Sequence, residues 1–250
     1  MIVLGFDTAT ASTAVGLRLG AGATLQARDA PRPGEHPGHA VRLLAMASEL
    51  LGAAGLGWGA IERIAVGLGP GTFTGLRVGV ATARALAQSR ALELVGVSSL
   101  MALAETAAAR AQGRRGVLAV IDARRGEAFA AAYLPSEEGL LSEVCAASAM
   151  APAELAGMMA RAQERGGRHG EDWLAVGDGA IRFREQLEEA GVEVPGDGSP
   201  LHLVSAEAIC ELGARAPAAS SYEQVLPDYR RRPDAELAPQ RGGALEVARS

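Results

Sequence analysis

The hydrophobic pattern of the chain begins with an almost continuous apolar run, residues 2–6, that ends at the carboxylate of Asp7. Such a run is typical of a central strand that is buried on both faces. An alternating segment follows at residues 13–19, and a third strand is expected at residues 24–29, after a short turn. The chain is therefore expected to open as a three-stranded antiparallel meander that places Asp7 at the end of its first strand.

Residues 38–54 repeat apolar side chains every three or four positions, which predicts an amphipathic helix. The stripe expected to face the core consists of Val41, Leu44, Ala45, Ser48 and Leu51. A strand at 64–68, a helix at 76–89, a strand at 92–97 and a helix at 98–111 follow. Three antiparallel strands followed by this helix and strand alternation give the order of a ribonuclease-H-like lobe.

A second pattern of the same kind starts near residue 117. A buried-strand signal at 117–121 again ends in an aspartate, Asp122, and a further strand is expected at 127–134. A helix at 153–165, a strand at 174–177 and helices at 181–190 and 206–214 are expected to complete the second unit. The predicted fold class is α/β with two ribonuclease-H-like lobes, residues 1–112 and 113–220, then a segment 221–232 and a mobile tail 233–250.

A glycine-rich turn, GPGTFTGLR at residues 69–77, joins the strand at 64–68 to the next helix. Thr74 is the expected N-cap of that helix, with the first helical turn near Gly75 or Leu76. The backbone amides of such a turn favour an anion or an acidic side chain. The chain has no lysine, however, and all 24 of its basic residues are arginines. This excludes a P-loop nucleotide hydrolase and a Schiff-base enzyme.

Charge and cysteine content exclude other classes. The formal net charge of −5 gives no basic surface for nucleic-acid phosphates, so direct RNA binding by the chain alone is not expected. Cys145 and Cys210 are too few and too far apart for a disulfide framework or a zinc knuckle, and we expect free thiols in a reducing cytoplasm. Without a secretion signal or a long apolar run, a cytoplasmic location is expected.

The histidines and serines at helix starts have ordinary explanations. His36 and His39 flank Pro37 and have no third ligand at a recognisable spacing, so we expect a solvated helix entry and no metal site. Ser98 and Ser99 precede a helix without a G-x-S-x-G elbow, which indicates capping roles.

A stripe of small residues runs along the helix after the glycine-rich turn: Gly75, Gly79, Ala83 and Ala87. Their four-residue spacing keeps them on one face, where another backbone can approach closely. Two interior glycines cost the helix about 1 kcal/mol each relative to alanine, which indicates that close packing compensates. The residues alone leave open whether this packing partner belongs to the same chain or to another.

Five motifs together resemble the TsaB family, also called YeaZ. They are residues 2–10, GLGPGTFTGLRVGVATARALA at 67–87, GVSSLMALA at 96–104, IDARRGEAF at 121–129 and PDYRR at 227–231. The resemblance implies the fold of the actin, sugar-kinase and Hsp70 ATPases, built from two ribonuclease-H-like lobes. It also implies a role in forming N6-threonylcarbamoyladenosine at position 37 of tRNAs that read codons beginning with A.

Partners follow from the same resemblance. It implies a non-catalytic scaffold for the transferase TsaD, which carries a metal-binding histidine pair with four-residue spacing, unlike the three-residue spacing of His36 and His39. The ATPase TsaE joins the heterodimer, tRNA is reached through the complex, and without its partner the chain is expected to form a homodimer through first-lobe helices. The expected interface combines the small-residue stripe with a second edge, His39, Leu43, Met46 and Leu50.

Nucleotide binding stays an open hypothesis. Asp7, Thr8 and Thr10 occupy the position where the ATPases of this fold place residues that face the metal and phosphates of a nucleotide, yet such residues are also common in turns. No cofactor is expected to be required by the chain itself, and ATP or ADP is possible at the interface of the complex. The alternatives are a stand-alone ATPase or metallopeptidase of the actin-like fold and a homodimeric regulatory protein.

Overall fold

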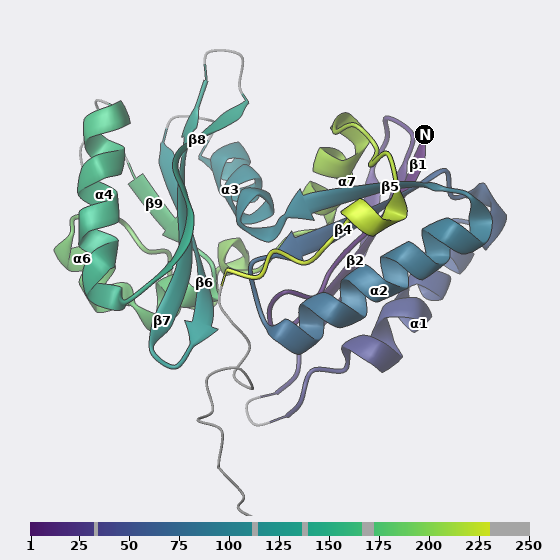
Figure 1. Cartoon of the computed structure of the whole chain (residues 1–250), viewed down its shortest axis with the longest axis horizontal. Coiled ribbons are helices and arrows are strands. Elements are labelled where there is room, and N and C mark those ends of the chain that lie inside the picture. The colour runs from purple at the N-terminus through teal and green to yellow at the C-terminus, as the bar shows by residue number, and fades with distance from the viewer. Residues whose placement is uncertain (33–34, 112–114, 137–139, 167–172, 231–250) are drawn as a thin grey trace, which may run out of the picture.

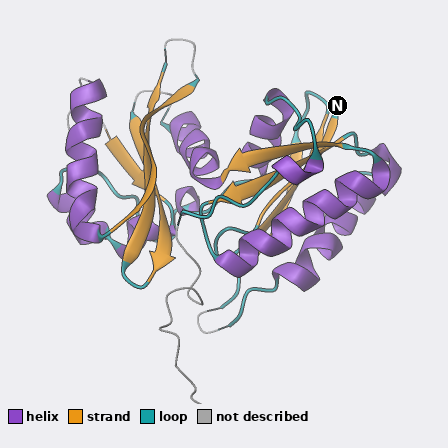
Figure 2. Ribbon diagram, viewed as in Figure 1, coloured by secondary structure: helices purple, strands orange, loops and turns teal. Residues whose placement is uncertain are grey.

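The computed structural model describes residues 1–32, 35–111, 115–136, 140–166 and 173–230, which form two mixed β-sheets with helices outside and between them (Figures 1 and 2). The strand orders are β3-β2-β1-β4-β5 and β8-β7-β6-β9. The strands β3-β2-β1-β4 of the first sheet correspond in order to β8-β7-β6-β9 of the second. The predicted α/β fold of two related units is therefore confirmed.

The first sheet is centred on β1 (Ile2–Asp7). It pairs antiparallel with β2 (Thr13–Leu19), which pairs antiparallel with β3 (Thr24–Asp29), so the predicted meander is confirmed. On its other side β1 pairs in parallel with β4 (Arg63–Gly69), and β4 with β5 (Glu93–Ser98). The carboxyl ends of β1, β4 and β5 consequently lie at one edge of the sheet.

Two helices, α1 (His39–Ala53) and α2 (Phe73–Arg90), cover one face of this sheet. The side chains that α1 buries are His39, Leu43, Met46, Ala47, Leu50 and Leu51. The predicted core stripe is wrong except for Leu51, because Val41 is 79% exposed and Leu44 is 44% exposed. Both stripes are apolar, but the buried one carries more large side chains and removes more apolar area from water.

The second sheet contains β6 (Gly116–Arg124), β7 (Glu127–Pro135), β8 (Leu141–Met150) and β9 (Trp173–Val176). Strand β8 was not predicted, because its sequence LSEVCAASAM mixes small and polar residues and its pairing with β7 is interrupted by register shifts. One face of this sheet packs on α4 (Pro152–Gly166), α5 (Asp178–Arg182) and α6 (Arg184–Glu189). Helices α5 and α6 replace the single helix expected at 181–190.

A third apolar cluster lies between the sheets and includes side chains of α3 (Ser99–Arg110) and α7 (Ala206–Arg215). Figure 1 shows α3 between the two sheets. The sequence placed α7 in the second lobe, but the structure packs it on the first sheet. Gly5 and Gly16 make room there, since a Cβ atom at Gly5 would lie 2.6 Å from Cys210 Sγ. A missing side chain on the sheet thus decides where the helix docks.

The chain then returns along the first lobe. Short 3₁₀ turns occur at η1 (Trp58–Ala60), η3 (Pro200–His202) and η4 (Tyr222–Gln224). The amide of Ala219 donates to Leu94 O (2.9 Å), and Figure 1 shows the final described segment running toward the second sheet. The predicted lobe boundary at 112–113 and the tail 233–250 lie outside the described residues. Within the described part of the chain, no helix is long and apolar enough to span a membrane.

Candidate functional site

The candidate site lies where β1, β4 and β5 end, and Asp7 is its central charge. The Asp7 side chain is buried, with 1% exposure. Its Oδ1 accepts from the amide of Ala9 (2.8 Å), and its Oδ2 accepts from Ser99 Oγ (2.5 Å). Burial raises the pKa of Asp7, although these two hydrogen bonds act in the opposite direction. Gly67 leaves the space that this carboxylate occupies.

Ser99 connects three elements at this point. Its hydroxyl donates to Asp7 and accepts from the amide of Gly69 (3.2 Å), so it joins the ends of β1 and β4 to the start of α3. The capping role predicted for Ser98 is confirmed, because its Oγ accepts from the amide of Met101. The capping role predicted for Ser99 is wrong. No local sequence signal reveals its contact, since 92 positions separate Ser99 from Asp7.

Thr8 fixes the next part of the loop to α2. Its Oγ1 donates to Gly75 O (2.7 Å), and a Cβ atom added at Gly79 would collide with the same Oγ1. A Cβ atom at Gly75 would likewise collide with the carbonyl oxygen of Thr8. Gly75 and Gly79, the first half of the small-residue stripe, therefore pack against a loop of the same chain. The sequence alone did not identify this packing partner.

The glycine-rich turn uses its amides within the chain as well. The amide of Thr72 donates to Ala9 O (2.7 Å), and Gly71 allows this close approach. Helix α2 begins at Phe73 after Thr72, whose side chain makes no capping bond. The predicted N-cap at Thr74 and helix start near Gly75 are therefore wrong, because the bond from Thr72 to the loop fixes the earlier start. The amides of Gly69 and Thr72 are not available to an anion in this arrangement.

In the proposed nucleotide-facing motif of Asp7, Thr8 and Thr10, the side chains of Asp7 and Thr8 already have hydrogen-bond partners in the chain. Both carboxylate oxygens of Asp7 and the hydroxyl of Thr8 have partners in the chain, and both residues are buried. Thr10 is half-buried at the same turn. Nucleotide binding stays a prediction, and it would require these groups to exchange their present partners.

The two histidines near α1 have different surroundings. His36 is exposed and precedes the helix, whereas His39 is 4% exposed, so the expectation of a solvated entry is wrong for His39. Its Nδ1 lies 2.9 Å from Thr13 Oγ1, and burial lowers its pKa. The described residues contain no group of three histidine, cysteine or acidic side chains placed to hold a metal ion.

The second lobe repeats the arrangement with different partners. Asp122 lies near the end of β6, and both of its carboxylate oxygens accept from Arg182 Nη1 (3.0 and 2.8 Å). Asp178 accepts from the amide of Asp122 (3.0 Å), and burial raises the pKa of Asp178. Arg124 and Arg125 follow in the left-handed backbone region, with φ of 65° and 53°. In each lobe, an aspartate at or near the end of the central strand therefore bonds to a neighbouring helix.

The residues predicted to form a partner interface are buried inside the chain. They are His39, Leu43, Met46, Leu50, Gly75, Gly79, Ala83 and Ala87. The structure gives them a packing role beneath α1 and α2. The exposed faces carry other side chains: Val41, Leu44, Ala45 and Ser48 on α1, and Arg77, Ala81 and Ala85 on α2. Partner binding stays a prediction, and the side chains able to make first contact are the outward ones.

The late PDYRR motif contacts both lobes through its described residues. The Arg77 guanidinium lies 3.7 Å from the centroid of Phe73 and donates to the Tyr229 hydroxyl (3.2 Å). The amide of Asp228 donates to Leu68 O (2.8 Å), and Arg230 Nη1 donates to Ala147 O on β8 (2.7 Å). The motif therefore ties the end of the described chain to the start of α2 and to the second sheet.

Known proteins resemble this chain over most of its length. The family profile of TsaD, described as tRNA N6-adenosine threonylcarbamoyltransferase, matches residues 35–236. The tRNA threonylcarbamoyladenosine biosynthesis protein TsaB of Escherichia coli K12 is 33% identical over 192 residues, which cover 77% of this chain and 78% of that protein.

Solved structures also resemble this chain in their fold. A Pseudomonas aeruginosa protein, described as uncharacterized and similar to the peptidase YEAZ, superposes with a TM-score of 0.73 at 29% identity, covering 92% of this chain and 99% of that one. The ROK hexokinase of Thermus thermophilus has a TM-score of 0.51 at 16% identity, covering 86% of this chain and 100% of that one, which shows a shared fold alone.

Proposed function

The chain belongs to the TsaB (YeaZ) family, and from this premise we propose that it acts in the biosynthesis of N6-threonylcarbamoyladenosine in tRNA as a non-catalytic subunit. Its role is to bind the transferase TsaD and hold it in an active conformation, with the ATPase TsaE as a further partner. The tRNA is contacted through the complex.

The observation that carries the non-catalytic role is the internal bonding of the Asp7 site. A catalytic carboxylate must reach its substrate, but Asp7 is buried and bonded to Ala9 and Ser99. The hydroxyl of Thr8 is bonded to Gly75 O. In the nearby turn, the amides of Gly69 and Thr72 donate hydrogen bonds to acceptors of the same chain. These groups stabilise the junction of two strands and two helices, a structural role that suits a scaffold.

The proposed partner surface is the outward face of α1 and α2. Val41 and Leu44 are large exposed hydrophobic side chains one helical turn apart, and Ala45 and Ser48 continue the same face. Apolar side chains gathered on one exposed face favour a protein partner over water. On α2 the exposed Ala81 and Ala85 give a smooth surface that allows a partner helix to approach. The same face is proposed to form the homodimer when TsaD is absent.

Reconstitution tests the function. Purified TsaD and TsaE, a threonylcarbamoyl-adenylate source and unmodified tRNA are incubated with or without this chain, and the modified nucleoside is measured by mass spectrometry. We expect modification only when the chain is present and no turnover by the chain alone. Equal modification without the chain would contradict the scaffold role.

The enzyme alternative has its own result in the same experiment. The name of the Pseudomonas protein refers to a peptidase, and a stand-alone ATPase or metallopeptidase would show turnover that depends on Asp7. ATP and a peptide pool are therefore offered to the isolated chain and to Asp7→Ala. Turnover by the wild-type chain that the variant lacks would favour this alternative over the scaffold.

A further inference from the structure

A cavity of about 480 Å³ lies where β3, α3, α7 and the segment before α7 meet. Its volume is in the range of sites for small molecules. Helices α3 and α7 belong to the apolar cluster between the sheets, whereas α1 and α2 belong to the cluster on the opposite face of the first sheet. The cavity is therefore separated from the proposed partner surface, and the scaffold role does not use it.

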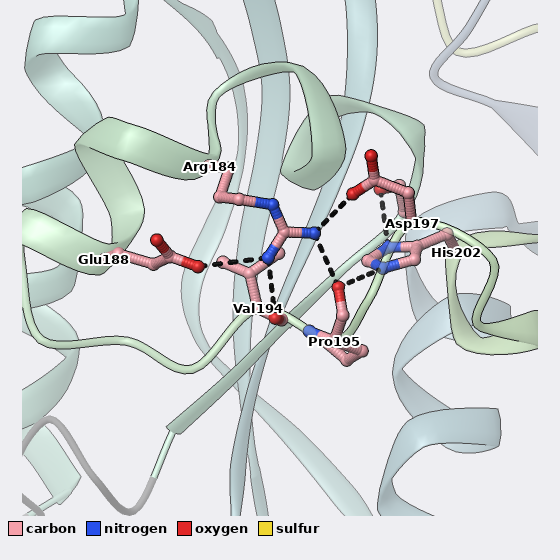
Figure 3. Close-up of polar contacts among 7 residues, drawn as sticks. Arg184, Glu188, Val194, Pro195, Asp197 and His202 are labelled. Carbon is pink, nitrogen blue, oxygen red and sulfur yellow. Dashed lines mark hydrogen bonds and ion pairs between the residues drawn. The ribbon is translucent and has the colours of Figure 1, made fainter.

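One wall of the cavity is held in place by the polar network drawn in Figure 3. The Arg184 guanidinium donates to the carbonyl oxygens of Val194 (2.8 Å) and Pro195 (2.6 Å) and pairs with Asp197 (2.6 Å). The buried His202 ring lies 3.0 Å from Pro195 O through Nε2 and 3.0 Å from Gly177 O through Nδ1. The segment that supplies Pro200, Leu203 and Ser205 to the wall is thus fixed before any ligand arrives.

The acidic side chains that line the cavity already have partners. The contacts are Glu211 Oε1 to Arg18 Nε (2.8 Å), Glu105 Oε1 to Arg215 Nη1 (4.0 Å), and Glu207 Oε2 to Gln26 Nε2 (3.3 Å). Their charge or hydrogen-bonding capacity is partly used by these neighbours. Glu211 and Glu105 therefore repel an incoming anion less than unpaired glutamates would, whereas Glu207 bonds to a neutral amide and keeps its charge.

Two arginines of the lining differ from this pattern. Arg28 Nη2 donates to the carbonyl oxygen of Val204 (2.6 Å), and Arg110 lies in the last turn of α3. Neither forms an ion pair with another residue in the described part of the chain. Burial of part of the Arg28 side chain lowers its pKa, the charge of Asp7 acts in the opposite direction, and both arginines keep exposed surface. A guanidinium without an ion-pair partner can bind a carboxylate or a phosphate through two parallel hydrogen bonds.

We propose that this cavity binds a small organic anion whose carboxylate or phosphate group is held by Arg28 and Arg110. The apolar body of the ligand lies against Ala109, Leu203 and Ala208, which line the same cavity. Arginine forks give the charged end its orientation, and the short apolar surfaces limit the size of the remainder. The site is independent of the proposed function, so either can fail without the other.

The test is a titration of the full chain, followed by two-dimensional amide NMR, with butanoate and with inorganic phosphate as separate probes. Saturable shifts of amides around Thr106 and Leu203 are expected, with a Kd in the millimolar range for ligands this small. Butanamide, which has the same shape without the charge, is expected to give no saturable shift. Comparison of the two anions shows which head group the site prefers.

Variants make the assignment specific. Arg110→Gln keeps an exposed polar side chain and is expected to weaken binding of the preferred anion about tenfold, because one guanidinium is lost. Arg28→Gln has the same expected effect but also removes the bond to Val204, so its folding is checked by circular dichroism. The matched control, Arg161→Gln on the exposed side of α4, is expected to bind as wild type. Shifts that do not saturate, or equal affinity in Arg110→Gln and wild type, would overturn the proposal.

Discussion

At the residue scale, the contact between Ser99 and Asp7 shows how a single hydroxyl fixes a buried charge. The ends of β1, β4 and β5 are neighbours in the sheet, so a side chain at the start of α3 can reach the carboxylate from far along the sequence. The apolar run before Asp7 placed this carboxylate correctly at a strand end. The identity of its donor depends on the pairing of strands and could not be read from local spacing.

His39 gives the pH-dependent prediction at this scale. Burial lowers its pKa in the folded protein, whereas in the unfolded chain it returns to about 6.5. Below that pH the unfolded chain binds a proton that the folded protein binds less readily, so the free energy of unfolding falls as the pH falls. The expected loss is at most about 1.4 kcal/mol per pH unit from this group. Urea unfolding between pH 7.5 and 5.5 measures it.

The matched pair of variants for this prediction is His39→Gln and His36→Gln. The first is expected to reduce the decline in stability, while the second, at an exposed position, is expected to keep it. The raised pKa values of Asp7 and Asp178 act in the opposite direction, because the folded protein takes up these protons more readily than the unfolded chain. Comparison with wild type cancels their contribution. An unchanged decline in His39→Gln would contradict the assignment.

At the scale of elements, the position of α2 depends on two glycines that have no side chain at its contact with a loop. Gly75 and Gly79 lie against the loop that contains Thr8, and the hydroxyl of Thr8 bonds to the helix backbone at this contact. The loss of helix propensity at two glycines is offset by this close approach. A bulky or charged residue at Gly79 would therefore disturb the fold itself, and such a variant cannot serve as a specific probe of partner binding.

The corresponding prediction compares two helical glycines. Gly79→Ala is expected to destabilise the protein by about 1–3 kcal/mol, because its Cβ atom collides with Thr8 Oγ1. Gly52 on α1 is the control, since a Cβ atom there meets nothing within 4 Å, and Gly52→Ala is expected to stabilise by about 0.5–1 kcal/mol. Chemical denaturation of both variants measures the difference. Equal effects of the two substitutions would show that the loop contact does not matter.

Sequence reasoning recovered the elements of the fold better than the direction in which they face. Strands β2 and β3 agree with their predicted bounds, because alternation and turn residues define them locally. Helix α1 carries apolar side chains on two faces, so periodicity alone could not decide that Leu43 is buried and Leu44 exposed. The small-residue stripe of α2 predicted close packing correctly, but the partner of Gly75 and Gly79 is Thr8, a contact made only by the folded chain.

At the scale of the whole molecule, the two sheets are joined by a shared middle layer and by the last described residues. Helix α7 follows the second sheet in sequence but packs on the first, and the PDYRR segment bonds to Leu68 O and to Ala147 O. Later parts of the chain therefore contact both lobes. This connection favours a rigid body, which suits a subunit that supports a partner from one external face.

The outward face of α1 gives the prediction for the assembly. Val41→Glu combined with Leu44→Glu places two charges where a partner would exclude water, at positions that are exposed in the isolated chain. The fold is therefore expected to stay intact while binding is lost. The matched control is Ala160→Glu, which adds a charge to the exposed side of α4 in the second lobe. Circular dichroism and thermal unfolding verify that all three proteins are folded.

Calorimetric titration of purified TsaD with these three proteins tests the scaffold role of this face. We expect wild type and Ala160→Glu to bind with the same affinity, and the Val41→Glu, Leu44→Glu variant to bind about a hundredfold more weakly or not at all. Undiminished binding of TsaD by the folded double variant, or the absence of binding by wild type, would contradict a scaffold role carried by this face.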